Sequence, residues 1–457
     1  MRKIILFVLI CLLGQGVAAQ QDISLYTLNN VFQQSYINPA YLPKSSVNVG
    51  LPVISSIYFN GSNTGFPLGR FLSPNGGRKV DIDKMINNLS KNNLLAADFN
   101  TDLLSLGIKI KSTYLSFSFS EVFNMNFVYP KDFFVFLFKG NGDEELLGRR
   151  ANFDGLAFNM NLYHQAALGL SIPVGEKFRA GARVKYLMGL LNVTTTKSKL
   201  GVTTGADNFA LTLDGALALK TSGFGLINSE DAAKVAQERL LNPGTNTGLA
   251  LDLGAEYFFT DRITFSASLL NMGYIKWTND VKNFENDDIN YTFSGINVQN
   301  FGSTDFTKEL QDKLDTLSER VKFKESTDAY SARLNPQVIV AGNLAVNDYN
   351  SVGAIVRSEL IGKILRPSAS FYYQFKVNHW LGATVNYSYL NKSLVNIGGG
   401  FCVKLLPFQF YIASDNVLAP LALITAKGVQ LRAGINLAFG GKEPKKLRVP
   451  VYDPSKE

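Results

Sequence analysis

The stretch VQLRAGINLAFGG, residues 429–441, alternates between apolar side chains and polar or small ones. The apolar positions are Val429, Leu431, Ala433, Ile435, Leu437 and Phe439. A period of two predicts a β-strand with one apolar face and one polar face. The apolar face must touch either the core of a soluble protein or the lipid of a membrane.

The N-terminus predicts export from the cytoplasm. A basic start and a short apolar run, Ile4–Leu13, precede the small residues Val17-Ala18-Ala19. This pattern is typical of a secretory signal peptide, here residues 1–19, because the apolar run is too short to span a bilayer. Cys11 would leave with it, so Cys402 would be the only thiol of the mature chain and no intramolecular disulfide could form.

Composition narrows the class of protein further. The 457 residues carry a formal charge of +8, but no basic patch is interleaved with stacking aromatics, which argues against nucleic acid as a partner. After residue 19 no apolar run approaches the roughly eighteen residues of a membrane helix. If the mature chain is embedded in a membrane, it must therefore be a β-barrel.

The opening alternation recurs along the chain. Further segments with this pattern are 104–110, 156–172, 178–188, 247–259, 351–359, 367–377, 379–389 and 393–404. Many reach the roughly nine to eleven residues of a tilted membrane strand. Their polar faces carry charged residues that we expect to face the lumen: Arg179, Arg183, Lys185, Asp252, Glu256, Arg357 and Glu359.

Two all-β folds can produce this alternation. A soluble sandwich packs two apolar faces together, whereas a membrane barrel turns its apolar face to lipid and its charges inward. The signal peptide, the strand lengths, the lack of disulfides and the aromatic strand ends favour the barrel. We predict a transmembrane antiparallel β-barrel of about fourteen strands over residues 47–440. A hairpin at 192–204 and 207–220 would make it sixteen if it joined the wall.

The connections predict how the barrel is oriented. In this strand count, the tight turns fall at one end and the long connections, such as 276–332, fall at the other. Short periplasmic turns and long outer loops are the expected asymmetry, so both termini should be periplasmic. We predict short helices in the outer loops at 130–140, 229–241 and 305–323, and a basic periplasmic tail at 441–457.

Residues 432–439, RAGINLAF, resemble the C-terminal signal by which the insertion machinery recognises bacterial outer-membrane barrels. Arg432, Gly434, Leu437 and Phe439 occupy its polar, glycine, hydrophobic and aromatic places. The departure is that a tail follows Phe439.

Near the other end, Asn38-Pro39-Ala40 resembles the Asn-Pro-Ala motif of FadL-like outer-membrane channels. The resemblance implies that residues 20–46 form an N-terminal periplasmic or plug segment inside a fourteen-stranded barrel. The layout LNN, INPA, GLPVISSIYFNGS, SDNVLAP and GINLAFG is similar to an uncharacterised FadL-like family of the Bacteroidota. A looser similarity links the chain to the PorV and PorP/SprF barrels of type IX secretion.

Catalytic and metal-binding patterns are missing from the sequence. The only histidines are His164 and His379, which are too few for a zinc or haem site and have no accompanying nucleophile motif. We therefore predict no catalytic residues, no metal and no cofactor, and we expect that the protein is not an enzyme.

Two functions remain open at this point. FadL-like resemblance implies passive uptake of hydrophobic or amphipathic small molecules across the outer membrane. The alternative is an accessory barrel for type IX secretion or surface protein assembly, whose long loops and tail would bind a protein partner. A soluble periplasmic all-β protein is a minor third possibility.

Overall fold

The computed structural model describes residues 22–28, 30–67, 82–224, 245–293, 321–362, 364–377, 380–394, 396–419 and 426–440. The predicted signal peptide and basic tail lie outside these residues, as do the helix predicted at 229–241 and most of that predicted at 305–323. Among the described residues, none of the helices has the length and apolar character needed to cross a membrane.

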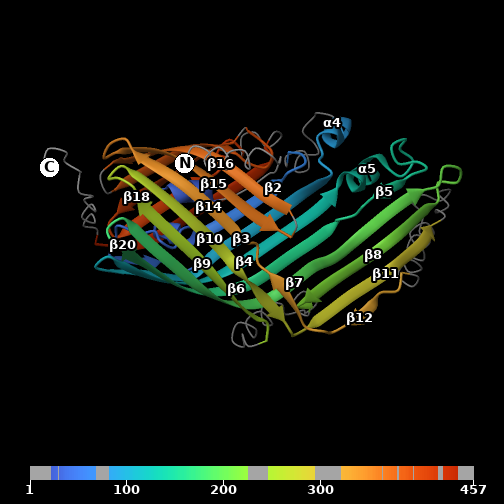
Figure 1. Ribbon diagram of the computed structural model, residues 1–457, viewed down its shortest axis with the longest axis horizontal. Helices are drawn as coiled ribbons and strands as arrows, with labels where there is room; N and C mark the ends of the chain where they lie inside the picture. Colours follow the sequence, from blue (N-terminus) through green and yellow to red (C-terminus); the bar gives the residue numbers. More distant parts are fainter. Residues whose placement is uncertain are drawn as a thin grey trace, which may run out of the picture.

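The strands form a closed antiparallel barrel of fourteen strands (Figure 1). Its wall is built from β1 (Val47–Gly50) with β2 (Ile57–Asn63), β3 (Asn92–Ile110), β4 (Thr113–Pro130), β6 (Ala157–Val174), β7 (Phe178–Thr204), β9 (Thr247–Phe258), β10 (Ile263–Trp277), β13 (Tyr330–Arg333) with β14 (Gln337–Ala345), β15 (Asn350–Ile361), β16 (Ile364–Val377), β17 (Leu381–Tyr389), β18 (Ile397–Leu405), β19 (Phe408–Ser414) and β20 (Gly428–Phe439). β1 and β2 together form one interrupted strand that pairs with β3 on one side and β20 on the other. This pairing closes the barrel and leaves the wall without an open edge.

The outer face of the wall is apolar. In β20, Leu431 and Phe439 are more than two-fifths exposed, whereas Arg432 and Asn436 are buried on the inner face. Large apolar side chains are exposed all around the wall, with Phe371 at 73% and Leu168 at 66%. A continuous apolar surface of this kind is unstable in water, so the wall faces lipid and the chain is a transmembrane barrel.

A second sheet extends from one end of the barrel. β7 is 27 residues long, and its final part leaves the wall to pair with β5 (Arg150–Asn152) and β8 (Leu211–Ser222). β8 pairs with β11 (Val281–Phe293), and β11 pairs with β12 (Lys324–Ser326). Figure 1 shows this extension standing beyond the wall strands. We call it the outer sheet.

The outer sheet corrects two predictions. The β7–β8 hairpin does not join the wall, so the possibility of sixteen strands was wrong. The connection predicted at 276–332 also contains β11, because strand pairing with β8 overrides the polar, acidic composition of that segment. The α-helices α4 (Ile82–Asn87) and α5 (Lys131–Lys139) contribute apolar residues to the cluster on this sheet. The helix predicted at 130–140 is confirmed as α5, with Pro130 and Gly140 as its caps.

The N-terminal segment, residues 22–46, lies against the inner wall of the barrel. It contains the short helix α2 (Ile23–Thr27) and a 3-10 helix, η1 (Phe32–Tyr36). One buried cluster joins its apolar side chains to inward-facing residues of six wall strands: Ile23, Leu25, Leu28, Val31 and Ile37 with Leu270, Ile339, Ala341, Ile355, Tyr372, Cys402, Tyr411 and Ala413. Each Ile, Leu or Val side chain of this cluster contributes about 1.5–3 kcal/mol when fully buried. The segment is therefore an integral part of the core within the barrel.

Candidate functional site

Next to this cluster, which shares Ile37 and Leu270 with its lining, the lumen contains a polar cavity of about 160 Å³. The segment contributes Asp22, Tyr36 and Ile37 to its lining. The wall contributes Tyr58, Asp98, Asn100, Asp102, Ser120, Val122, Asn124, Tyr163, Gln165, Arg183, Lys185, Leu270, Asn271, Gln337, Arg357, Glu359 and Arg432. Residues from both ends of the chain and from its middle thus meet in one space.

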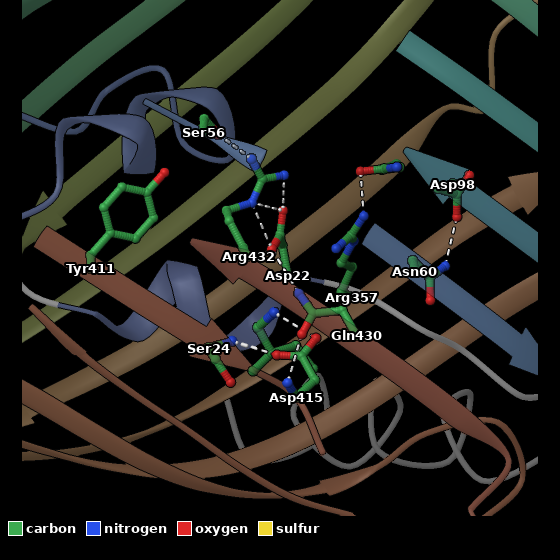
Figure 2. A network of polar contacts seen from close by, with 12 residues as sticks. Asp22, Ser24, Ser56, Asn60, Asp98, Arg357, Tyr411, Asp415, Gln430 and Arg432 are labelled. Carbon is green, nitrogen blue, oxygen red and sulfur yellow. Dashed lines mark hydrogen bonds and ion pairs between the residues drawn. The ribbon is translucent and has the colours of Figure 1, made fainter. Parts of the chain in front are cut away.

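The first contact between the segment and the wall is an ion pair (Figure 2). The Arg432 Nε atom donates to both carboxylate oxygens of Asp22, at 3.0 and 2.9 Å. Arg432 also donates from Nη1 to Ser56 Oγ at 2.6 Å, and its Cζ atom lies 4.4 Å from the ring centre of Tyr58. Because both charges are buried, this ion pair fixes the position of the segment strongly against the wall.

Asp415, which follows β19 and lies outside the strand, holds the start of α2. Its carboxylate accepts the backbone N–H groups of Ile23 and Ser24 at 3.1 and 2.7 Å. Burial, together with the neighbouring negative charge of Asp22, raises the pKa of Asp415 to about 7. The docking of α2 therefore depends on a carboxyl group that changes charge near neutral pH.

The motif Asn38-Pro39-Ala40 packs on a pair of wall glycines. Gly181 of β7 and Gly254 of β9 are register partners. A Cβ atom at Gly181 would lie 2.1 Å from the carbonyl carbon of Pro39, and one at Gly254 would lie 2.8 Å from the amide nitrogen of Ala40. These positions require glycine because the backbone of the segment occupies the space of a side chain.

The seven charged residues predicted to face the lumen fall into two groups. On β7 and β9, Asp252 pairs with Lys185 at 2.7 Å and with Arg183 at 3.8 Å, and Arg179 is the register partner of Glu256. On β15, Glu359 pairs with Arg366 at 3.3 Å, while Arg357 donates to Gln337 Oε1 at 2.6 Å. Arg183, Lys185, Arg357 and Glu359 line the cavity together; its lining does not include Arg179, Asp252 or Glu256.

The residues of the insertion-signal resemblance divide between the two faces of β20. Arg432 and Gly434 are buried on the inner face, and Leu437 and Phe439 lie on the other. A Cβ atom at Gly434 would lie 2.0 Å from the carbonyl oxygen of Ser55, so this glycine also admits the break between β1 and β2.

Three polar residues of β3 escaped the sequence analysis. Asp98, Asn100 and Asp102 are spaced by two and line the cavity. Their spacing of two is itself the pattern of one strand face. However, the pairing of β3 with β4 shifts register between Asp102 and Leu104. This irregularity reverses the alternation, so that the apolar pattern read from Leu104 onward could not be extended backward.

The residues of this chain that could bind a metal ion are His, Cys, Asp and Glu. Within the part of the chain that the structure describes, no group of three or more His, Cys, Asp or Glu residues is placed to hold a metal ion. His164 is buried beside the ring of Phe119, with centroids 5.7 Å apart, and its Nδ1 atom makes no hydrogen bond to any described residue. The side chains that line the cavity offer charged groups and hydrogen-bond donors and acceptors.

A closed wall with an apolar exterior, and an interior partly filled by the chain's own N-terminal segment, define an integral membrane β-barrel. The chain belongs to the family described as a family of unknown function (DUF5723), whose model matches residues 39–415. No curated protein matches it.

Several solved barrels have a similar arrangement. The Ralstonia pickettii toluene transporter TbuX is 10% identical, with 93% of this chain and 99% of that chain covered and a TM-score of 0.41. A Pseudomonas aeruginosa FadL homologue is 12% identical, with 93% and 100% covered and a TM-score of 0.41. The translocator domain of the autotransporter NalP from Neisseria meningitidis is 10% identical, with 89% and 93% covered and a TM-score of 0.34. Likeness at this level assigns neither substrate nor mechanism.

Proposed function

We propose that the protein is a passive channel of the bacterial outer membrane that admits small amphipathic molecules. The observation that carries this proposal is the cavity of about 160 Å³ between the N-terminal segment and the charged wall. Its lining is mainly polar but includes Ile37, Val122 and Leu270, which favours amphipathic solutes over purely hydrophobic ones.

In this proposal the N-terminal segment acts as a plug. It contributes directly to the cavity through Asp22, Tyr36 and Ile37, so a solute that enters the cavity touches it. Movement of the segment would require the loss of the Asp22–Arg432 ion pair and of the packing of Pro39 on Gly181. Both contacts lie inside the barrel, where a gate would have to act.

The lengths of the connections between strands indicate how the barrel is oriented in the membrane. Short turns such as that between Val174 and Phe178 would face the periplasm, and the outer sheet would face the cell exterior. Both termini would then be periplasmic, with outer-membrane lipid around the wall. The strand 432–439 would present its apolar and aromatic residues to the insertion machinery during assembly.

Permeation through proteoliposomes tests the proposal. An Arg183→Ala, Arg357→Ala double variant changes the charge of the cavity and is expected to change the permeation rate of small amphipathic solutes. A variant lacking residues 442–457 serves as the control and is expected to leave the rate unchanged. An unchanged rate in the double variant would count against transport through this lumen.

Native mass spectrometry of the barrel, gently extracted from its own membrane, adds an independent test. A barrel that carries a bound small molecule supports the channel. A barrel that carries a second protein and no small molecule would instead point to a role in secretion or surface assembly.

A further inference from the structure

The cavity has an acidic side on β3, where two carboxylates form no ion pair with any residue that the structure describes. Asp98 accepts hydrogen bonds from Asn60 and Asn124 at 2.6 and 2.8 Å. Asp102 accepts hydrogen bonds from Tyr36 and Ser120, both at 2.8 Å. Among the described residues, neither carboxylate is in an ion pair with a cationic side chain. Two acids are thus held by neutral donors alone.

The opposite charge is also present without a full set of partners. Arg357 is 8% exposed and lines the cavity, and among the described residues its guanidinium group donates only to the neutral Gln337. Arg183 is 3% exposed, lines the cavity and shares the carboxylate of Asp252 with Lys185. It also donates from Nη2 to Ser118 Oγ at 2.9 Å, and its Cζ atom lies 4.4 Å from the ring centre of Tyr36. Within the described chain, the Nε atoms of Arg183 and Arg357 make no hydrogen bond. Arg357 in addition has no ion pair with a carboxylate among the described residues, and burying a charged group without such a partner is costly.

The cavity therefore offers acceptors and donors on different strands. The carboxylates of Asp98 and Asp102 and the side chain of Asn100 come from β3. The guanidinium groups come from β7 and β15. A volume of about 160 Å³ is close to that of a cavity that holds one benzene molecule, which limits a ligand to roughly that size.

We propose that the cavity binds a compact zwitterion with one ammonium and one carboxylate group, of the size of a small aliphatic amino acid. The ammonium lies against Asp98, Asn100 and Asp102, and the carboxylate lies against the guanidinium groups of Arg183 and Arg357 that line the cavity. The inference rests on the proposed function, because it names the class of solute that the channel takes. A purely apolar molecule leaves Asp98, Asp102 and Arg357 without an opposite charge, and a singly charged one supplies an opposite charge to only one side of the cavity.

Three matched probes test this with the full barrel in detergent micelles. Valine carries both charges, 3-methylbutanoate is valine without its amino group, and isobutylamine is valine without its carboxylate. Dissociation constants are measured by titration with saturation-transfer NMR. Valine is expected to bind about tenfold or more tightly than either analogue, because each missing charge removes charge-assisted hydrogen bonds.

Charge-removing variants assign the two ends of the ligand. Asp102→Asn is expected to weaken valine and isobutylamine and to leave 3-methylbutanoate unchanged. Arg357→Gln is expected to weaken valine and 3-methylbutanoate and to leave isobutylamine unchanged. Lys197→Gln, in the exposed Lys197–Asp287 pair of the outer sheet, is the control and changes none of the three. If a variant fails to fold, the three probes on the unaltered protein still decide.

Equal binding of the three probes, tighter binding of toluene than of valine, or no saturable binding of valine would overturn the inference. Permeation separates this failure from failure of the proposed function. If solutes enter proteoliposomes but valine binds no more tightly than its two analogues, the proposed channel is supported and the zwitterion site is rejected. If valine binds as expected but no solute enters the proteoliposomes, the zwitterion site is supported and the proposed channel is rejected.

Discussion

Asp22 and Arg432, separated by 410 positions in the sequence, form a buried ion pair that fixes the N-terminal segment against the last strand of the barrel. Arg432 lies on the inner face of β20, and Asp22 lies at the start of α2. The contact joins the first described residue of the chain to the strand that closes the wall. The position of the N-terminal segment therefore depends on a contact with the wall of the barrel.

Replacement of Asp22 by Asn should release the segment. It leaves the Arg432 guanidinium buried without a counter-charge, at a cost of about 3–5 kcal/mol. Cys402, 3% exposed in the cluster that includes Leu25, provides the measurement, because displacement of the segment exposes its thiol. Maleimide labelling of Cys402 should accelerate at least about tenfold in Asp22→Asn. The surface variant Lys197→Gln should label like the wild type, and slow labelling of Asp22→Asn would contradict the coupling.

Replacement of Gly181 by Ala should displace the segment at its other end. The new Cβ atom would meet the backbone of Pro39, and overpacking of this kind costs about 1–3 kcal/mol. Protease cleavage within the N-terminal segment should become faster while the wall stays intact. Gly342→Ala is the matched control, because its Cβ would lie at an ordinary 3.5 Å from the ring of Phe265. Equal cleavage of both variants would show that the glycine pair does not hold the segment.

The barrel should lose stability as the pH rises through neutrality because of Asp415. Its pKa is raised to about 7 in the folded protein, against about 3.9 in an unfolded chain. Between these values the folded state binds more protons, so this contribution is fully present below about pH 4 and is lost as the pH rises through about 7. Between these two pKa values, the free energy of unfolding falls by about 1 kcal/mol per pH unit because of this group.

Thermal unfolding at pH 5 and pH 8 measures this effect. The wild type should lose more stability between the two values than Asp415→Asn, which has no titrating group at this position. The comparison cancels the groups that the two proteins share. Identical pH dependence in both would remove Asp415 as the cause.

A charged side chain on the outer face of the wall should destabilise the barrel. Phe371 of β16 is 73% exposed, and an Arg on a lipid-facing position near the membrane centre costs about 2–4 kcal/mol. Phe371→Arg should therefore unfold at lower urea concentration in lipid bilayers. Phe209→Arg, at an exposed position in the turn between β7 and β8, should have little effect. Equal stability of the two variants would argue against lipid at Phe371.

The strand pattern of the barrel is local information. Alternation from Val429 to Phe439 shows which side chains share a face, because successive residues of a strand point in opposite directions. Together with the signal peptide, the strand lengths, the lack of disulfides and the aromatic strand ends, this alternation predicted a transmembrane barrel of about fourteen strands, and the structure confirms that fold. The hairpin of β7 and β8 was ambiguous, because alternation does not reveal whether a strand stays within the wall.

The cavity depends on contacts between distant parts of the chain. Asp98 and Asp102 were missed because a shift in strand pairing reverses the alternation, and such shifts are set by the neighbouring strand. The pairing of Asp22 with Arg432, and of Pro39 with the glycines of β7 and β9, follows from where the N-terminal segment folds inside the closed barrel. The sequence by itself determined the wall and its two faces, since the period of a strand is a property of neighbouring residues. Only the tertiary structure decided which charges meet in the lumen and which remain unpaired, since closure of the wall brings together residues that no local pattern relates.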